Sequence, residues 1–335
     1  MILGGDIGGT KTNLALFEED SKDFSCIHFG TFPSASYADL SLIVEEFLSK
    51  MAENERSLIK VACFAIAGPV HKGVCKATNL PWVIEAESLA KKCRIPKVYL
   101  INDLEANAYA IDILSPEQFK QLYAGQKSAE GNRAVISPGT GLGEAGLYWD
   151  GKRYHPFASE GGHAEFGPRD ALQGRLSGYL CTKYQHPSYE RVLSGPGIHT
   201  LFSFLVESEK REAPAWLLEE MQHTDPSTVI SHHAVNHTCA LCEETLRLFA
   251  NILGSEAGNC ALKLMATGGI YIGGGIAPRV LPFLLEPPFL QGFKDKGRLE
   301  PLLALIPIYV ILDDKASLKG SARFCQFREP VRSMI

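Results

Sequence analysis

The stretch Ile2-Leu3-Gly4-Gly5-Asp6-Ile7-Gly8-Gly9-Thr10 opens the chain, and the apolar run Asn13-Leu14-Ala15-Leu16-Phe17 follows it closely. Apolar residues on both sides of a glycine-rich turn predict two strands joined by that turn. Glycine has no Cβ, so its backbone N–H group can approach an anion closely. The turn is therefore a candidate phosphate site.

The same plan of strand, glycine turn and strand recurs near the middle of the chain. The apolar run 134–137 leads into Pro138-Gly139-Thr140-Gly141-Leu142-Gly143, and extended apolar residues continue to Trp149. A third glycine turn, Gly273-Gly274-Gly275, follows the apolar run 270–272. A lone turn of this kind is usually a plain hairpin. Three of them, two with threonine hydroxyls, together favour a nucleotide phosphate site.

Two formal motif matches fail on their context. Residues 5–12 resemble a P-loop, but Thr10 stands where that motif has glycine, and residues 13–17 continue as a strand where a P-loop opens a helix. Gly141, Gly143 and Gly146 have the spacing of a dinucleotide-binding motif, yet a strand and a turn follow them in place of the helix. We discount both matches.

The length and the repeated pattern predict two α/β domains. The 335 residues exceed what one hydrophobic core usually holds, and the two strand–turn–strand units indicate domains of a related plan. The apolar run 59–67 is typical of a strand buried on both faces of a sheet. Helical spacing predicts a helix over residues 40–48 with Ser36 as its N-cap. The pair His232-His233 is expected in a polar connecting stretch.

Composition and charge are those of a globular protein. Hydrophobic residues make up 45% and charged residues 21%, and the net charge of −5 argues against a nucleic-acid partner. No apolar run approaches the roughly 20 residues that span a bilayer, and no export signal is visible, so no membrane partner is expected. The nine cysteines are scattered and odd in number, which argues against a disulfide framework and predicts a cytoplasmic protein.

Asn102-Asp103 stands at the end of the short apolar run 98–101, before a segment with a helical pattern. Ligands of open α/β sheets bind at the carboxyl ends of the strands. There the carboxylate of Asp103 could accept a proton from a hydroxyl group that attacks phosphorus. The alternative is that Asp103 caps the following helix, and the segment by itself favours the cap.

Residues 159–168, Ser-Glu-Gly-Gly-His-Ala-Glu-Phe-Gly-Pro, place two carboxylates and an imidazole among glycines. Glu160 and His163 could bind adjacent hydroxyl groups of a polyol. A metal site is the rival, but two glutamates and one histidine are a weak ligand set for zinc. A plain surface loop is less favoured, because the glycines and Pro168 specify a particular turn.

Two further groups could bind metal but have simpler explanations. Cys239-x-x-Cys242 has histidines nearby, yet it is a single pair at the start of a helical pattern, so core packing is favoured over zinc. Asp313-Asp314 follows the last expected strand and could hold magnesium, but a solvated turn is favoured.

The chain resembles the bacterial-type glucokinases, members of the sugar kinase, actin and Hsp70 superfamily. The resemblance runs end to end, and the order and spacing of its motifs make it specific. The matching segments are 5–10, 67–69, 78–82, 101–103, 139–143, 160–163 (Glu-Gly-Gly-His), 190–197 (Glu-Arg-Val-Leu-Ser-Gly-Pro-Gly) and 273–275.

The resemblance implies an α/β, two-domain ribonuclease-H-like fold, that of the actin-like ATPases and sugar kinases, with a cleft between the domains. The smaller domain would comprise residues 1–112 and 314–335, and the larger domain residues 113–313. The implied reaction is ATP-dependent phosphorylation of glucose at its 6-hydroxyl, which gives glucose 6-phosphate and ADP. The substrates are a small-molecule sugar and Mg-ATP, and the implied assembly is a homodimer.

The resemblance also assigns roles to residues. It makes Asp103 the catalytic base, and it gives glucose contacts to Asn79, Asn102, Asp103, Glu160, His163 and Glu190. Asp6 would bind Mg²⁺ through a water molecule. The nucleotide would contact Gly5, Asp6, Ile7, Gly8, Gly9 and Thr10 in the first turn, Gly139, Thr140 and Gly141 in the second, and Gly273, Gly274 and Gly275 in the third.

Departures from the family pattern keep alternatives open. A related branch of repressors and kinases carries a cysteine-rich zinc motif after its Glu-x-Gly-His segment. Here residues 168–172 follow without cysteine, so no structural zinc is expected, although Thr10-Lys11-Thr12 is closer to that branch. A kinase for mannose, fructose or N-acetylglucosamine, a phosphoryl donor other than ATP, and a non-catalytic sugar-sensing regulator remain as alternatives. The regulator would need a DNA-binding extension before the first strand.

Overall fold

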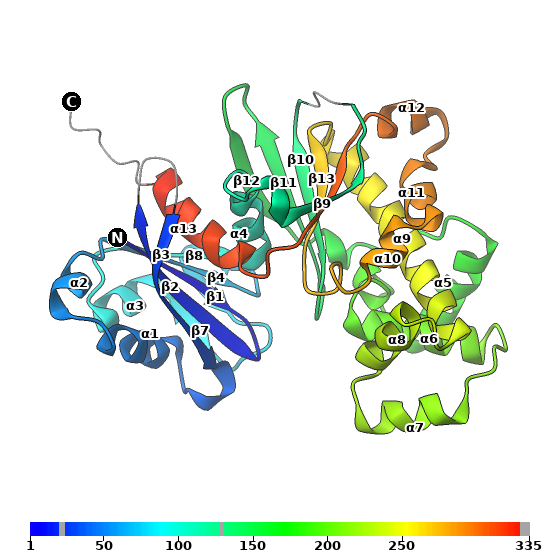
Figure 1. Ribbon diagram of the computed structural model, residues 1–335, viewed down its shortest axis with the longest axis horizontal. Coiled ribbons are helices and arrows are strands. Elements are labelled where there is room, and N and C mark those ends of the chain that lie inside the picture. The colour runs from blue at the N-terminus through cyan, green and yellow to red at the C-terminus, as the bar shows by residue number, and fades with distance from the viewer. Residues whose placement is uncertain (20–23, 127–129, 329–335) are drawn as a thin grey trace. The chain divides into compact units, whose positions relative to one another are not determined.

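The computed structural model describes residues 1–19, 24–126 and 130–328, and its chain divides into two units (Figure 1). Unit 1 comprises Met1–Pro116 and Asp313–Ile335, and unit 2 comprises Glu117–Leu312. Residues 329–335, which we expected in the smaller domain, lie outside the described residues. No helix in the described ranges is both long enough and apolar enough to cross a membrane.

Unit 1 is built on a five-stranded sheet of order β3-β2-β1-β4-β8 and a small three-stranded sheet of order β5-β6-β7. The strands are β1 (Ile2–Ile7), β2 (Lys11–Glu19), β3 (Phe24–Pro33), β4 (Val61–Ile66), β5 (Val70–His71), β6 (Val74–Lys76), β7 (Val83–Glu85) and β8 (Val98–Asn102). The helices are η1 (Ser34–Ser36), α1 (Leu40–Ser49), α2 (Glu53–Ser57), α3 (Ala86–Cys93), α4 (Asp103–Ala110) and α13 (Ala316–Arg328), with η2 (Pro116–Gln118) at the boundary.

The interior strand β4 explains why unit 1 needs helices on both faces of its sheet. All six residues of β4 are buried, and their side chains alternate between two hydrophobic clusters. Ala62, Phe64 and Ile66 belong to the cluster formed with α1 and α3, whereas Cys63 and Ala65 belong to the cluster formed with α4 and α13. The C-terminal helix α13 thus completes the core of the N-terminal sheet.

Unit 2 is built on a six-stranded sheet of order β12-β11-β10-β13-β14-β9. The strands are β9 (Phe119–Tyr123), β10 (Arg133–Pro138), β11 (Leu142–Trp149), β12 (Tyr154–Ser159), β13 (Gly269–Ile272) and β14 (Ile308–Ile311). The helices are η3 (Gly161–His163), α5 (Ala171–Lys183), η4 (Tyr189–Arg191), α6 (Gly195–Glu207), α7 (Ala215–His223), α8 (Pro226–Val235), α9 (Ala240–Leu264), α10 (Leu281–Leu285), α11 (Pro287–Lys294), η5 (Gly297–Leu299) and α12 (Glu300–Leu303).

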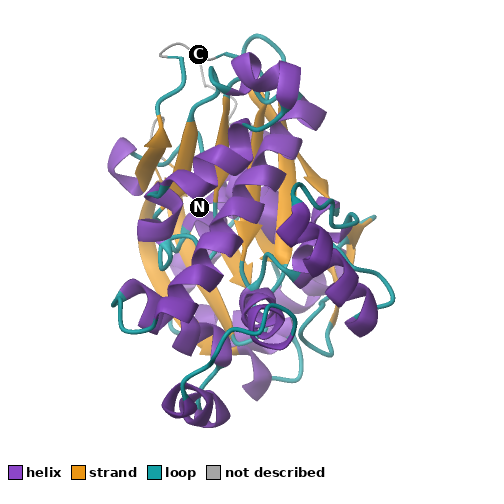
Figure 2. Cartoon of the chain, turned by 90° about the vertical axis from the view of Figure 1, so that its right-hand side faces the viewer, coloured by secondary structure: helices purple, strands orange, loops and turns teal. Residues whose placement is uncertain are grey.

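The two large sheets repeat one plan, as the sequence predicted. In each, the first three strands of the order pair antiparallel with their neighbours, and the third, fourth and fifth strands pair in parallel with one another in sequence. The paired sets are β3-β2-β1-β4-β8 in unit 1 and β12-β11-β10-β13-β14 in unit 2, where β9 adds a sixth strand. Figure 2 distinguishes these strands from the helices that cover them. The first two glycine turns are the hairpin turns β1–β2 and β10–β11.

Helix α9 contributes many residues to the hydrophobic core of unit 2. Fully buried residues of α9 pack together with Phe289 and Phe293 of α11 in one large hydrophobic cluster. A Cβ built on Gly254 would lie 2.0 Å from the carbonyl oxygen of Phe289, which shows that the two helices are in close backbone contact at this point. Glycine at this position is therefore required by the packing and not by a turn.

Two local predictions were wrong. The N-cap of α1 is Asp39, whose side chain accepts hydrogen bonds from the backbone N–H groups of Ser41 at 2.7 Å and Leu42 at 3.4 Å; Ser36 ends the preceding 3-10 turn. His232-His233 lies in α8 and not in a connecting stretch. Asp225 caps that helix and Pro226 occupies its first turn, a start signal that the polar composition obscured.

Candidate functional site

The candidate site in unit 1 lies at the carboxyl edge of its parallel strands. Ile7 at the end of β1 pairs with Ile66 of β4, and Ile66 pairs with Asn102 of β8. The three strands therefore end at the same level, and the residues that follow them emerge at one edge. These residues include Gly8 of the first glycine turn and Asp103.

Asn102, and not Asp103, caps helix α4. Its Oδ1 accepts hydrogen bonds from the backbone N–H groups of Leu104 at 2.8 Å and Glu105 at 3.4 Å, and its Nδ2 donates to the carbonyl oxygen of Gly68 at 3.2 Å. The helix-cap alternative for Asp103 is therefore wrong. Asp103 is the first residue of α4, where the positive end of the helix dipole favours a negative side chain.

The first glycine turn is held by its neighbours in unit 1. The backbone N–H of Gly8 donates to the carbonyl oxygen of Lys11 at 3.0 Å, and Ser34 Oγ donates to the carbonyl oxygen of Gly8 at 2.7 Å. A Cβ built on Gly9 would lie 2.6 Å from the Cβ of Asn79. The structure thus brings Asn79, which we predicted as a sugar contact, directly against the predicted phosphate turn.

Asp6, the predicted magnesium neighbour, is tied to the C-terminal helix. Ser317 Oγ of α13 donates to Asp6 Oδ1 at 3.0 Å. Burial raises the pKa of Asp6, while hydrogen bonds from Ser317 and Asn13 and the charge of Lys11 lower it. A bound cation would stabilise the charged carboxylate further, so the position suits Mg²⁺. The sequence did not reveal Ser317, because more than 300 residues separate it from Asp6.

Unit 2 brings the other two glycine turns together. The backbone N–H of Gly273 donates to the carbonyl oxygen of Ile136 at 2.9 Å, so the third turn starts beside β10. Gly274 has φ +79°, and a Cβ built on it would lie 2.3 Å from the carbonyl oxygen of Pro138. Among the residues that the structure describes, no atom lies within 4 Å of a Cβ built on Gly275. The two turns therefore form an open backbone surface of the kind that binds phosphate.

Glu190 links the second glycine turn to the sugar candidates of unit 2. Its Oε2 accepts a hydrogen bond from the backbone N–H of Leu142 at 3.0 Å. A Cβ built on Gly141 would lie 2.5 Å from the same oxygen, so only glycine leaves room for the carboxylate. The sequence predicted Glu190 through its motif and did not predict this contact.

His163 lies between the two predicted sugar-binding glutamates. Its Nε2 is 3.9 Å from Glu160 Oε2, and its Nδ1 is 4.0 Å from Glu190 Oε1. The side chains of His163 and Glu160 are 57% and 63% exposed, so their polar atoms remain accessible to a ligand. An imidazole flanked by two carboxylates offers donors and acceptors at the spacing of neighbouring hydroxyl groups.

The simpler explanation, core packing, holds for the cysteine pair, whereas the solvated turn that we predicted at Asp313-Asp314 is wrong for Asp313, because its side chain is only 9% exposed. Cys239 and Cys242 are buried in the hydrophobic core of unit 2, and burial raises the pKa of Cys242, so core packing is confirmed for this pair. Asp313 accepts hydrogen bonds from Lys319 Nζ at 2.7 Å and from the backbone N–H of Lys315 at 2.9 Å.

A cavity of about 700 Å³ in unit 2 lies apart from all of these residues. None of the predicted site residues lines it. Its walls come from β9, α10, α11 and their neighbours and include Leu122, Tyr123, Arg169, Leu284, Phe289, Leu290, Lys294 and Asp295. The concentration of glycine turns and polar groups, and not this cavity, marks the candidate site.

The sequence prediction missed one buried ionisable group beside the site. Glu144 lies in β11, directly after the second glycine turn, and only 6% of it is exposed. A Cβ built on Gly161, between Glu160 and His163, would lie 2.0 Å from Glu144 Oε2. The signal in the sequence was a single glutamate at the start of an otherwise apolar strand.

Comparison with known proteins agrees with this arrangement. The sequence model of the glucokinase family matches residues 3–327. The chain is 42% identical to a glucokinase of Nostoc punctiforme over 96% of this chain and 98% of that protein. It is 40% identical to a glucokinase of Synechocystis, with 96% of each chain covered.

A solved structure shows the same fold. The glucokinase from an Antarctic psychrotroph superposes with a TM-score of 0.82 at 34% identity, over 96% of this chain and 98% of the other. The expected α/β fold of the sugar kinases is confirmed. The motifs, the repeated sheets and these likenesses lead to one conclusion: the chain belongs to the glucokinase family.

Proposed function

We propose that the chain transfers the γ-phosphoryl group of ATP to the 6-hydroxyl of glucose, with Asp103 as the general base. The assignment of this reaction rests on the membership of the chain in the glucokinase family. The observation that supports the base is that Asn102 is the N-cap of α4, so Asp103 is the first helical residue, at the carboxyl edge of the sheet. There its Oδ1 accepts a hydrogen bond from the backbone N–H of Leu104 at 3.0 Å. In the reaction Asp103 accepts the proton of the 6-hydroxyl as its oxygen attacks phosphorus.

We assign the sugar contacts to polar groups in both units. In unit 1 Asn79 and Asn102 stand beside the first glycine turn and Asp103. In unit 2 His163, Glu160 and Glu190 form the cluster of imidazole and carboxylates. These groups orient the sugar and so position its 6-hydroxyl, which in phosphoryl transfer is a large part of the rate enhancement.

The three glycine turns bind the nucleotide in this proposal. Backbone N–H groups of residues 9–10, 140–141 and 274–275 stabilise negative charge that spreads over the phosphate oxygens in the transition state. The N–H groups of Gly8, Gly139 and Gly273 donate within the protein and hold the three turns in shape. Asp6 would hold Mg²⁺ through a water molecule. When Mg²⁺ is bound, it would neutralise negative charge on the phosphates. Its carboxylate, oriented by Ser317, is of the ligand type that Mg²⁺ prefers.

The variant Asp103→Asn tests the base. It removes the proton acceptor and keeps the shape, so kcat is expected to fall by about 10²–10⁴-fold while glucose binding persists. A coupled assay measures kcat, and calorimetry measures glucose binding. The matched control is Asp112→Asn, an exposed carboxylate just after α4. Turnover of Asp103→Asn equal to that of the control would exclude this role.

The sugar and the phosphoryl donor are tested with a panel. Glucose, mannose, fructose and N-acetylglucosamine are each assayed with ATP, ADP and polyphosphate. The highest kcat/KM is expected for glucose with ATP. A sugar that binds without turnover under every donor would favour the regulator.

The remaining assignments concern ions, assembly and compartment. We propose Mg²⁺ dependence, no structural zinc, a homodimer, and a cytoplasmic location. All nine cysteines lie in the described residues and each is a free thiol, which agrees with a reducing compartment. Activity after chelation tests the Mg²⁺ dependence, and metal analysis of the purified protein tests for zinc. Light scattering tests the homodimer, and cell fractionation tests the location.

A further inference from the structure

Glu144 is a buried carboxylic acid directly under the loop that carries Glu160 and His163. It pairs across the hairpin with Ser159 of β12, and its carboxyl group lies against Gly161. Ser159 Oγ accepts a hydrogen bond from the backbone N–H of Gly161 at 2.9 Å, which holds the loop down on β11 and β12. The proposed mechanism does not use this carboxyl group.

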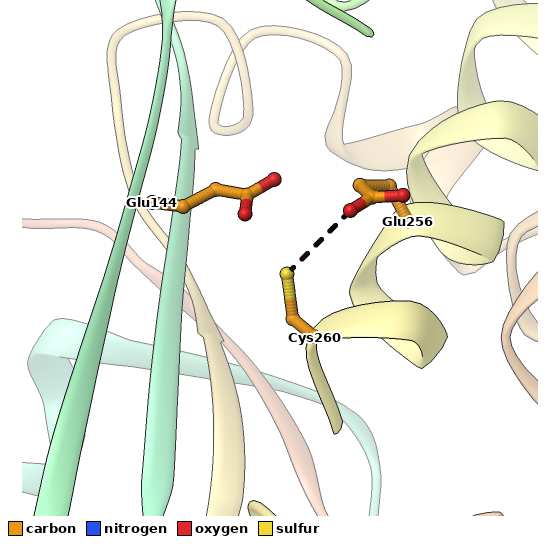
Figure 3. A group of neighbouring side chains, drawn as sticks. All are labelled: Glu144, Glu256 and Cys260. Atoms are coloured by element: carbon orange, nitrogen blue, oxygen red, sulfur yellow. Dashed lines mark hydrogen bonds between the residues drawn. The ribbon is translucent and has the colours of Figure 1, made fainter. Parts of the chain in front are cut away.

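Two groups of helix α9 face Glu144 (Figure 3). Oxygen atoms of Glu144 and Glu256 and the Sγ of Cys260 all lie within 4.8 Å of one another, and all three residues are buried. Cys260 Sγ is 3.9 Å from Glu256 Oε1, with the thiol as donor. Among the described residues no hydrogen-bond partner is found for Glu144 Oε1, which is fully buried.

The nearest cation, Lys263, pairs with Glu256, and for Glu144 the Lys263 charge and a hydrogen bond from Cys260 offset only part of the cost of burial. Lys263 Nζ lies 3.3 Å from Glu256 Oε1, and Asn259 Nδ2 donates to Glu256 Oε2 at 2.7 Å. Lys296 Nζ donates to Asn259 Oδ1 at 2.8 Å. A charged Glu256 is therefore stabilised, whereas a charged Glu144 would face a second carboxylate in a buried space.

The charge balance indicates that Glu144 carries a proton near neutral pH. Burial, followed by the negative charge of Glu256, raises the pKa of Glu144 to about 7. Two carboxylates this close commonly share one proton, because both cannot ionise cheaply. The titratable and charged groups around Glu144 on the surrounding elements are Glu160, His163, Tyr189, Glu190, Glu256, Cys260, Lys263 and Lys296.

We propose that protonated Glu144 is a positioning residue, which supports Gly161 and thereby holds Glu160 and His163 in the geometry that binds sugar. This inference rests on the proposed function. When Glu144 loses its proton, its carboxylate has no donor for Oε1 and is repelled by Glu256. Gly161 packs directly against this carboxyl group, so a carboxylate that moves away from Glu256 displaces the loop. Ionisation thus weakens glucose binding and leaves Asp103, in the other unit, unchanged.

The first test is the pH dependence of the glucose KM. If only the protonated form binds well, KM rises roughly tenfold between pH 6 and pH 8 while kcat keeps the pH profile set by the catalytic groups. Glu144→Gln mimics the protonated acid and has nothing to ionise. Its KM is expected to stay near the wild-type value at pH 6 and to lack this rise. The difference between the two profiles isolates the contribution of Glu144, because every other group is common to both proteins.

A second variant keeps the test valid if Glu144→Gln does not fold. Glu256→Gln removes the neighbouring charge, so Glu144 ionises more easily and the midpoint of the KM rise moves to lower pH. The matched control is Glu243→Gln, a half-buried carboxylate on the same helix that pairs with Arg247 and His237. It is expected to leave the midpoint unchanged.

The outcomes distinguish this inference from the proposed function. A wild-type protein that phosphorylates no sugar at pH 6 would contradict the proposed function. Normal phosphorylation with the same KM profile in wild type and Glu144→Gln would overturn the inference alone. Stoichiometric metal that is lost on chelation together with sugar affinity, in wild type and not in Glu144→Gln, would also overturn it, because the cluster would then be a metal site.

Discussion

Replacing Gly320 with alanine tests how closely α13 must approach α4, the helix that begins with Asp103. A Cβ built on Gly320 would lie 1.7 Å from the carbonyl oxygen of Ala106 and 2.6 Å from its carbonyl carbon. Both are backbone atoms, so no side chain can rotate away to make room. The two helices must separate, and α4 must shift at the turn that follows Asp103.

The expected cost combines two opposing effects. An extra methyl group forced into a packed contact costs about 1–3 kcal/mol. Alanine regains up to about 1 kcal/mol, because glycine is the poorer helix former. Since backbone atoms form the contact, we expect a net loss of about 2 kcal/mol, which lowers Tm by roughly 4–8 °C. A displacement of the base by about 1 Å can lower kcat by about 10²-fold.

Thermal unfolding followed by circular dichroism measures the stability, and a coupled assay measures kcat. The control is Gly178→Ala in α5, an exposed helical glycine with nothing within 4 Å of an added Cβ. That variant is expected to be more stable than wild type by about 0.5–1 kcal/mol. Gly320→Ala with the stability of Gly178→Ala and with wild-type kcat would refute the close contact.

Three further substitutions test the site. Ser317→Ala removes a hydrogen bond that lowers the pKa of Asp6, so the acid limb of the pH profile of kcat/KM is expected to move to higher pH; an unmoved limb would separate Asp6 from the reaction. Asn102→Ala removes the cap of α4 and is expected to cost about 1 kcal/mol of stability, which chemical denaturation measures; Asn102→Asp, which keeps the acceptor, should lose less. Glu190→Ala removes the acceptor for the Leu142 N–H, so KM is expected to rise for glucose and for ATP, and a rise for glucose alone would contradict the link.

The hairpins and buried strands were predictable because their signals are local. Glycine turns between apolar runs specify β1–β2 and β10–β11, and a continuous apolar run specifies β4. Because this strand–turn–strand pattern occurs twice, the sequence alone predicts two sheets of related topology. Caps were less predictable, because several polar residues precede α1 and only the backbone conformation selects Asp39 over Ser36.

The contacts that organise the site were not predictable from spacing. Glu144 meets Glu256 only because β11 lies against α9, and more than 100 residues separate the two. Ser317 meets Asp6 across almost the whole chain. Burial turned Glu144 from an ordinary strand residue into a titrating group, and no pattern along the chain carries information about that burial.

If Glu190 binds sugar and the neighbouring turn binds nucleotide, as we propose, the carboxylate of Glu190 couples the two ligands thermodynamically. Its Oε2 binds the backbone of the turn proposed for the nucleotide, while its Oε1 lies 4.0 Å from His163 on the sugar side. A sugar that fixes the side chain of Glu190 also fixes the backbone of the turn at Leu142. The conformational entropy of these groups is then lost when the first ligand binds and is not lost again when the second ligand binds. By linkage, glucose raises the affinity for nucleotide by the same factor by which nucleotide raises the affinity for glucose.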